Sequence, residues 1–286
     1  MTMRKTISGI ACLTALANCG SSSDQMAMGQ MPPALPVLSI NASDNGSLTV
    51  GGTPANPTFS INGTEITGLA ENDLVNNGPL ASSLFTFRDV AFTHHFLGAR
   101  TNGGYVALGA SEFTPVGSEY TAATLNRTSE TVLPTTGTAL YQGDYAGLVS
   151  ERLAAGATNF NDVDYLVTGD VELNVNFNAA ILSGAITNRE VSAPANGTTV
   201  LGVSTDDVTL VASPINTNGV FAGVASGGDI NSSGGTNGTG AGSYTGLFVG
   251  PTGDAALGVV KLPINTGSTY PTDGALELGA FVADKQ

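Results

Sequence analysis

The chain has 286 residues with 9 Lys and Arg against 23 Asp and Glu, which gives a formal net charge of −14. So few basic side chains exclude a nucleic-acid-binding protein, because contacts with phosphate need Lys and Arg. The chain is 41% hydrophobic and only 11% charged, whereas disordered chains combine low hydrophobicity with high net charge, so the composition predicts a folded protein.

The N-terminus has the pattern of a bacterial lipoprotein signal. Two basic residues precede an apolar stretch, residues 6–17, that has the length of a signal-peptide core and is too short to span a bilayer. The segment LANC, residues 16–19, resembles the lipoprotein cleavage box, although Asn18 stands where that box usually has Gly, Ala or Ser. We predict a lipoprotein signal peptide over 1–18 and lipidation of Cys19. An ordinary secretory signal with a chance cysteine is the alternative.

Processing at this site would change both the cysteine content and the charge. The lipid would occupy the thiol of Cys19, and Cys12 would leave with the signal peptide, so the mature chain could form no disulfide. Loss of Arg4 and Lys5 would take the formal net charge from −14 to −16. Residues 19–36 are predicted to be the lipidated Cys and a flexible tether, because Ser, Met and Pro occur there without periodicity.

Short β-branched and aromatic runs alternate with Gly, Asn, Pro and Thr from residue 37 onward, which predicts an all-β protein. Asn-Gly pairs recur between these runs, and this dipeptide suits the hairpin turn whose central residues need positive φ. The pairs begin at residues 45, 62, 77, 102, 196, 218 and 237. Residues 37–137 alternate less regularly and are predicted to be a β-rich handle domain, joined to the rest through residues 128–137.

The second half, residues 138–286, contains eight candidate strands. They lie at roughly 138–149, 165–177, 181–189, 206–214, 219–226, 242–249, 256–264 and 275–283. The segment 169–177 alternates apolar and polar residues, which is typical of a half-buried antiparallel strand. Eight such strands favour a closed antiparallel up-and-down barrel filled by its own side chains. A membrane-spanning barrel is less favoured, because aromatics are only 6% and Trp is absent.

Five motifs follow one another along this half. They are YQGDYAG at 141–147, GDVELNVNF at 169–177, LSGAI at 182–186, GLFVGP at 246–251 and GAFVADK at 279–285. In this order they resemble the eight-stranded barrel domain of transferrin-binding-protein-B-like surface lipoproteins over about residues 138–286. Two positions depart from the pattern of that family: Val249 replaces a common Tyr, and Val282 replaces a usual Gly.

The resemblance implies an outer-membrane lipoprotein, anchored through Cys19 and displayed at the cell surface, that binds a ligand without being an enzyme. Ligands of the family include host proteins and the iron source haem, and an outer-membrane transporter is a partner that the resemblance implies. In such proteins the handle often carries ligand recognition. Two alternatives stay open: a structural or adhesive envelope lipoprotein without a small ligand, and a carbohydrate hydrolase that would need only two carboxylates.

The residues themselves point to little catalytic chemistry. The chain has no Gly-x-Ser-x-Gly elbow and no Gly-x-x-x-x-Gly-Lys loop, and with two His and no free Cys a zinc site is not expected. Residues 159–164 gather oxygen ligands, but they lack the spacing and the closing Glu of a calcium loop, so a solvated turn is the simpler interpretation.

His94 and His95 are the only histidines, and they lie in the segment FTHHF at 92–96. On a strand, Phe92, His94 and Phe96 would share one face. An imidazole between two aromatic rings could ligate haem iron. We predict His94 and His95 as haem-binding candidates, with a hydrogen-bonded structural role as the alternative.

Overall fold

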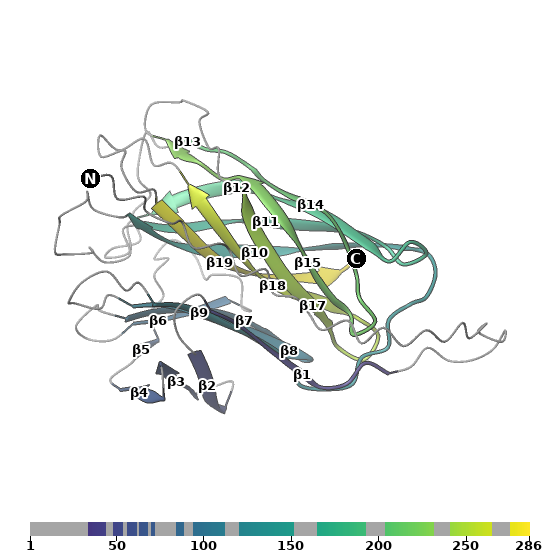
Figure 1. Cartoon of the computed structure of the whole chain (residues 1–286), viewed down its shortest axis with the longest axis horizontal. Coiled ribbons are helices and arrows are strands. Elements are labelled where there is room, and N and C mark those ends of the chain that lie inside the picture. Colours follow the sequence, from purple (N-terminus) through teal and green to yellow (C-terminus); the bar gives the residue numbers. More distant parts are fainter. Residues whose placement is uncertain are drawn as a thin grey trace, which may run out of the picture. The chain divides into compact units, whose positions relative to one another are not determined.

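The computed structural model describes residues 34–43, 48–53, 56–61, 63–67, 70–71, 84–88, 94–111, 120–151, 165–192, 204–231, 241–264 and 275–286. Every regular element within these ranges is a β-strand, so the all-β prediction is confirmed (Figure 1). Residues Pro32–Gln286 form one compact unit. The described part of the chain holds no helix with the length and apolar character needed to span a lipid bilayer.

Two antiparallel sheets form before the barrel strands. One has six strands in the order β1-β9-β8-β7-β6-β5, and the other has three in the order β2-β3-β4. Their bounds are β1 Leu38–Ser43, β2 Leu48–Thr53, β3 Asn56–Ile61, β4 Thr64–Ile66, β5 Ala70–Glu71, β6 Leu84–Arg88, β7 His94–Thr101, β8 Gly104–Ser111 and β9 Tyr120–Arg127. Phe59 of β3 stacks on Phe96 of β7 with ring centroids 4.3 Å apart, so aromatic packing joins the two sheets.

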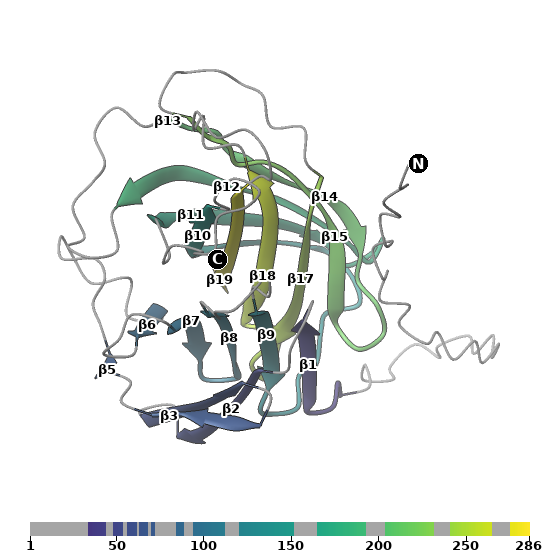
Figure 2. The ribbon, with the colours of Figure 1, turned by 60° about the vertical axis from the view of Figure 1, so that its left-hand side comes forward.

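A closed eight-stranded antiparallel barrel follows, in the order β10-β11-β12-β14-β15-β17-β18-β19 (Figure 2). Its strands are β10 Thr138–Glu151, β11 Tyr165–Asn176, β12 Ile181–Ser192, β14 Val208–Pro214, β15 Val220–Gly227, β17 Gly242–Val249, β18 Ala255–Ile264 and β19 Ala275–Lys285. Each predicted strand overlaps one of these, which confirms the barrel. The strand predicted at 206–214 begins two residues later, at Val208. Just before it, Ser204–Thr205 (β13) pairs with Ile230–Asn231 (β16).

Apolar side chains fill the inside of the barrel. In β11, Val171, Leu173 and Val175 are buried, while Glu172 and Asn174 between them are exposed, as the alternating pattern predicted. Residues from all eight strands continue this core, including Tyr141, Ile186, Leu210, Phe221, Tyr244, Val260 and Phe281. The interior of this barrel is therefore a packed core, as expected for eight strands.

Interior aromatic rings lie over glycines of the neighbouring strand. Gly246 is directly opposite Phe221, and Gly258 is directly opposite Phe281. A Cβ atom at either glycine would clash with that ring. Glycine therefore makes room for large aromatic side chains inside a narrow barrel, and the rings in turn cover its exposed backbone.

Part of the outer face of the barrel is buried as well. Leu278, Ala280 and Val282 of β19 point away from the interior and belong to an apolar cluster that also contains Val106 and Leu125 of the six-stranded sheet. The strands β10, β17, β18 and β19 supply most of the barrel side of this cluster, and Leu166 of β11 adds to it. Burial on both faces explains the nearly continuous apolar runs within these strands, such as 145–149, 255–260 and 278–283.

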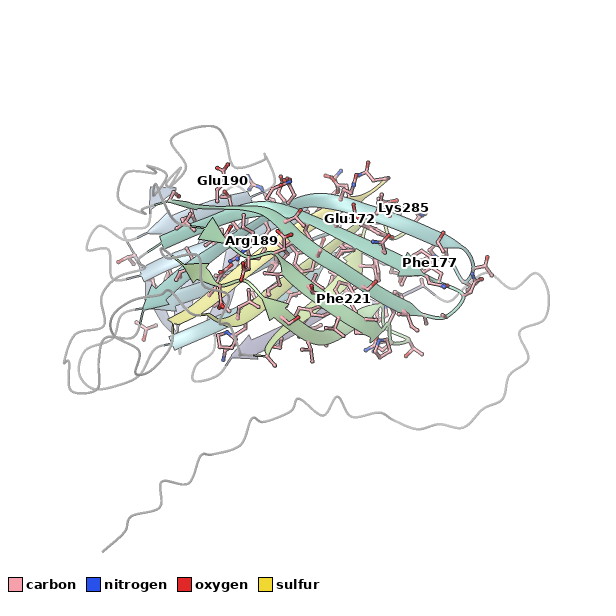
Figure 3. All side chains as sticks on the ribbon, turned by 90° about the horizontal axis from the view of Figure 1, so that it is seen from above. Glu172, Phe177, Arg189, Glu190, Phe221 and Lys285 are labelled. Carbon is pink, nitrogen blue, oxygen red and sulfur yellow. The ribbon has the colours of Figure 1, made fainter. Side chains whose placement is uncertain are left out.

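The two ends of the barrel differ in the length of their connections. At one end the turns are short, at 177–180, 215–219 and 250–254. At the other end the connections are long, at 152–164, 193–207, 228–241 and 265–274. We call these the short-turn end and the long-connection end. Figure 3 shows Phe177 and Lys285 toward the first and Glu190 toward the second.

Candidate functional site

The predicted haem candidates begin strand β7. The backbone of His94 pairs with Ser111 of β8, and His95 pairs with Ala110 and, on its other side, with Arg88 of β6. The side chains of both histidines lie outside the described residues. Cys19 and the oxygen-rich segment 159–164 also lie outside them, so these candidates stay predictions. Among the residues that the structure describes, no group of three or more His, Cys, Asp and Glu could hold a metal ion.

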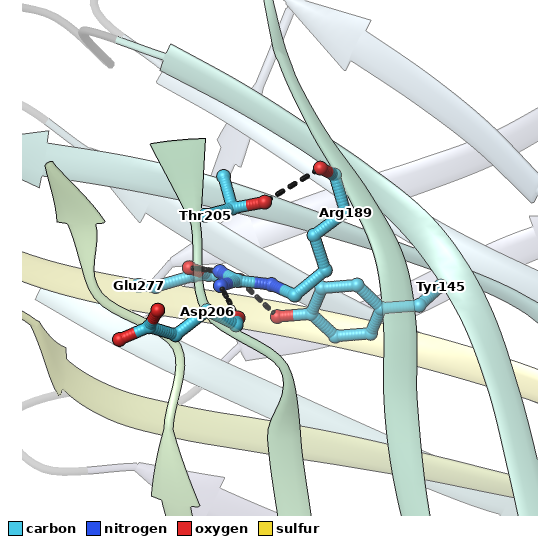
Figure 4. A network of polar contacts seen from close by, with 5 residues as sticks. All are labelled: Tyr145, Arg189, Thr205, Asp206 and Glu277. Carbon is cyan, nitrogen blue, oxygen red and sulfur yellow. Dashed lines mark hydrogen bonds and ion pairs between the residues drawn. The ribbon is translucent and has the colours of Figure 1, made fainter. Parts of the chain in front are cut away.

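The described residues bring together a polar network inside the barrel that the sequence did not suggest (Figure 4). Glu277 of β19 accepts a hydrogen bond on Oε1 from the Tyr145 hydroxyl at 2.5 Å. Its Oε2 forms an ion pair with Nη2 of Arg189 from β12, and both side chains are completely buried. Since both carboxylate oxygens are engaged and no water reaches them, this network is built to hold strands together rather than to meet a substrate.

The network also reaches the segment between β12 and β14. Nη1 of Arg189 donates to the Asp206 carbonyl at 2.7 Å, and the Thr205 hydroxyl donates to the Arg189 carbonyl at 2.6 Å (Figure 4). Thr205 belongs to β13, which pairs with β16. Arg189 therefore ties the small β13–β16 sheet to the barrel core at the long-connection end.

A β-bulge turns Arg189 into the barrel. Between Thr168 and Asp170 the register of β11 against β12 shifts by one residue, and Asn188 has a positive φ of 51°. Without this shift, the alternation that buries Ile186 would place position 189 on the outside. A bulge adds one residue to one strand and so reverses which side chains point inward. Asn tolerates this conformation better than most residues.

Burial raises the pKa of three tyrosine hydroxyls of the barrel. It raises the pKa of Tyr145 well above the ordinary value, and the Glu277 charge adds to the rise. It also raises the pKa of Tyr141, with a further contribution from Asp254, and of Tyr244, where the hydrogen bond with Ser213 opposes the rise. All three hydroxyls therefore keep their protons in the folded state at pH values where an unfolded chain releases them.

We therefore expect the barrel to lose stability steeply above about pH 10. The folded barrel keeps tyrosine protons that the unfolded chain releases. The stabilisation is therefore complete below the tyrosine pKa of the unfolded chain, and it falls as the pH rises above that value. Each tyrosine adds a slope of about 1.4 kcal/mol per pH unit. Urea unfolding of the soluble form from Gly20 at increasing pH, followed with tyrosinate absorbance, measures this. Ionisation of all tyrosines near pH 10 in the folded state would contradict the expectation.

A second polar centre lies where the six-stranded sheet meets the barrel. Arg127, the last residue of β9, is completely buried. Its Nε donates to the Phe248 carbonyl at 2.8 Å, Nη1 to the Pro36 carbonyl at 3.1 Å and Nη2 to the Asn218 carbonyl at 2.9 Å. These three bonds all go to neutral oxygens, and burial lowers the pKa of Arg127. One guanidinium thus holds strand β17, the β14–β15 turn and the segment before β1 together.

The same contacts fix the end of the predicted tether. Leu35 exchanges two backbone hydrogen bonds with Thr131, at 2.6 and 3.1 Å. Its side chain is 7% exposed and lies so close to Gly219 that a Cβ atom there would clash. Residues 35 and 36, predicted to belong to the tether, are therefore part of the folded unit. We call Leu35, Pro36, Arg127 and Thr131 the tether clamp.

The solvent face of the barrel carries an acidic strip. Asp144, Asp170 and Asp284 come from the neighbouring strands β10, β11 and β19. Partial burial raises the pKa of Asp144, and the charges of Asp170 and Asp284 raise it further. Asn188 donates to Asp170 Oδ2 at 2.7 Å. Such a strip repels acidic partners and attracts cationic ones.

Sequence reasoning did not identify Arg127, Arg189 or Glu277. For Glu277 a signal existed: it is the only charged residue in the run ALELGAFVA, and it has the same parity as the inward-facing Phe281. For Arg189 there was none, because the bulge that turns it inward depends on pairing with β11. The partners of Arg127 lie far along the chain, so its role is visible only in the fold.

No model of a known protein family matches the sequence, and no curated protein matches it. The chain is similar in structure to transferrin-binding protein B, as the sequence motifs predicted. A double mutant of this vaccine antigen from Haemophilus parasuis is 19% identical, with a TM-score of 0.42, over 80% of this chain and 40% of that one. A single mutant of the same antigen is 17% identical, with a TM-score of 0.45, over 87% and 45%.

A structure described as a surface lipoprotein is 13% identical, with a TM-score of 0.36, and the similarity covers 89% of this chain and all of that one. By contrast, the chain matches less than half the length of the two Haemophilus parasuis proteins.

Proposed function

We propose that this chain is an outer-membrane lipoprotein, anchored through a lipid on Cys19 and displayed at the cell surface, that binds a ligand without changing it chemically. The ligand is a host protein or an iron source such as haem, which an outer-membrane transporter would receive. The observation that carries the proposal is the packed interior of the barrel. Such a barrel acts as a rigid scaffold, so the ligand would contact the outside of the molecule.

Three features of the chain support this. The LANC segment at 16–19 resembles a lipoprotein cleavage box. One apolar cluster joins the barrel to the six-stranded sheet, so the sheet that contains His94 and His95 is held firmly in place. The ion pair of Arg189 and Glu277 is fully buried, which leaves it without access to a substrate.

Haem titration tests the ligand. The soluble form beginning at Gly20 is titrated with haem beside His94→Ala, His95→Ala and, as a matched control on an exposed turn, Thr217→Ala. We expect a saturable shift of the Soret band that one histidine variant loses and the control keeps, because imidazole is an iron ligand. No shift, or a shift that both histidine variants keep, would exclude haem at this site.

A host-protein ligand is tested separately. The immobilised soluble form is incubated with serum proteins, and retained proteins are identified and then titrated individually. A saturable complex with one of them would support the host-protein form of the proposal. If neither haem nor a serum protein bound, a structural or adhesive envelope role would replace it.

A further inference from the structure

The tether clamp determines where the chain leaves the folded unit. Leu35 lies against Gly219, and the Pro36 carbonyl shares the Arg127 guanidinium with Asn218. Gly219 and Asn218 belong to the turn 215–219 at the short-turn end. The remaining Arg127 partner, Phe248, is the penultimate residue of β17, next to the turn 250–254 at the same end. The tether therefore starts beside the short turns of the barrel.

The reach of the tether keeps that end close to its anchor. The 16-residue step from Cys19 to Leu35 spans about 22 Å on average for the flexible tether that the sequence predicts. A strand of 12 residues such as β12 is about 40 Å long, and with the usual tilt it gives a barrel about 30 Å tall. Because the anchor stays this close to the short-turn end, that end is favoured over the long-connection end as the one nearer the membrane.

Charge favours the same orientation independently. The three short turns, 177–180, 215–219 and 250–254, contain one charged residue, Asp254. The four long connections together contain six Asp and one Arg. At the short-turn end, exposed Glu130 and Asp284 add to Asp254, and exposed Lys285 offsets one of these charges. A chain with a formal charge of −16 after processing is repelled by anionic lipid, and the repulsion is smallest where acidic side chains are fewest.

We propose that the short-turn end of the barrel is the surface that faces the membrane, and that the long-connection end points away from it, because the tether clamp fixes the exit of the lipid-anchored segment beside the short turns. This orientation rests on the proposed lipid anchor at Cys19. It makes the short-turn end a surface for a lipid headgroup layer. The long-connection end, where Arg189 binds Thr205 and Asp206, is then the part presented to the outside.

Energy transfer to labelled lipid tests the orientation. Lipidated protein purified from expressing cells has its only original mature thiol blocked, so one introduced cysteine can be labelled selectively. Thr217→Cys marks the short-turn end and Glu190→Cys the long-connection end; both positions are exposed. Each labelled protein is inserted into vesicles of phosphatidylethanolamine and phosphatidylglycerol that contain a rhodamine-labelled lipid. We expect severalfold more efficient transfer from position 217 than from position 190.

A second variant tests the role of the clamp. Arg127→Met frees the last residues of the tether, so the difference between the two positions should shrink, whereas the exposed control Lys285→Met should keep it. Equal transfer from both positions in the lipidated, folded protein would overturn the orientation alone. A protein that carries no lipid and binds vesicles no better than Cys19→Ser would overturn the proposed anchor, and the orientation with it.

Discussion

Replacing Arg127 with methionine is expected to lower the free energy of unfolding by about 3 kcal/mol. The change removes hydrogen bonds to the carbonyls of Pro36, Asn218 and Phe248, and it leaves the buried Phe248 oxygen without its donor. Methionine fills much of the same volume, so the loss comes from the missing donors rather than from a cavity. Urea unfolding of the soluble form from Gly20, with its midpoint and slope, measures the effect.

Two further variants separate charge from geometry. Arg127→Lys keeps the positive charge, but a single ammonium cannot reach three carbonyls in different directions, so we expect most of the loss to persist. Lys285→Met removes a cation that is exposed at the surface and should change stability by less than about 0.5 kcal/mol. Full stability in Arg127→Lys would refute the geometric argument. Faster hydrogen exchange at the Leu35 amide in Arg127→Met would show directly that the tether clamp has opened.

Removing one partner of the buried ion pair should be still more damaging. Arg189→Met and Glu277→Leu are each expected to destabilise the barrel by about 3–5 kcal/mol, because each leaves the other charge buried without its counter-ion. The double variant should recover most of this loss, since two apolar side chains of similar volume can replace a buried pair. Some loss should remain, because the Asp206 carbonyl and the Tyr145 hydroxyl lose their partners.

A double-mutant cycle on the same soluble form measures this coupling. Glu190→Gln, at an exposed position next to Arg189 on β12, is the matched control and should leave stability nearly unchanged. If the losses of the two single variants simply added in the double variant, the two side chains would act independently. That result would contradict the coupling expected of an ion pair. Equal hydrogen exchange in β13 of the parent and of Arg189→Met would show that Arg189 does not hold the β13–β16 sheet.

The regular part of the fold was predictable because its signals are local. Alternation with a period of two located β11 from its own residues, and short Gly- and Asn-containing segments marked the turns that close the barrel. Gly63 and Gly219 of the Asn-Gly pairs at 62 and 218 indeed have positive φ, of 80° and 67°. Such features depend on neighbours within a few residues, so a single sequence contains the information.

The sequence by itself determined the all-β class, the eight barrel strands and a lipoprotein-like N-terminus. The tertiary structure alone decided which polar residues are buried and what they bind. Arg127 meets carbonyls that lie 91 and 121 residues away along the chain, and Arg189 faces Glu277 only because the bulge at Asn188 reverses its side. Periodicity fixes the two faces of a strand, but the partners of a buried charge depend on long-range register, which only the closed barrel and its packed sheet establish.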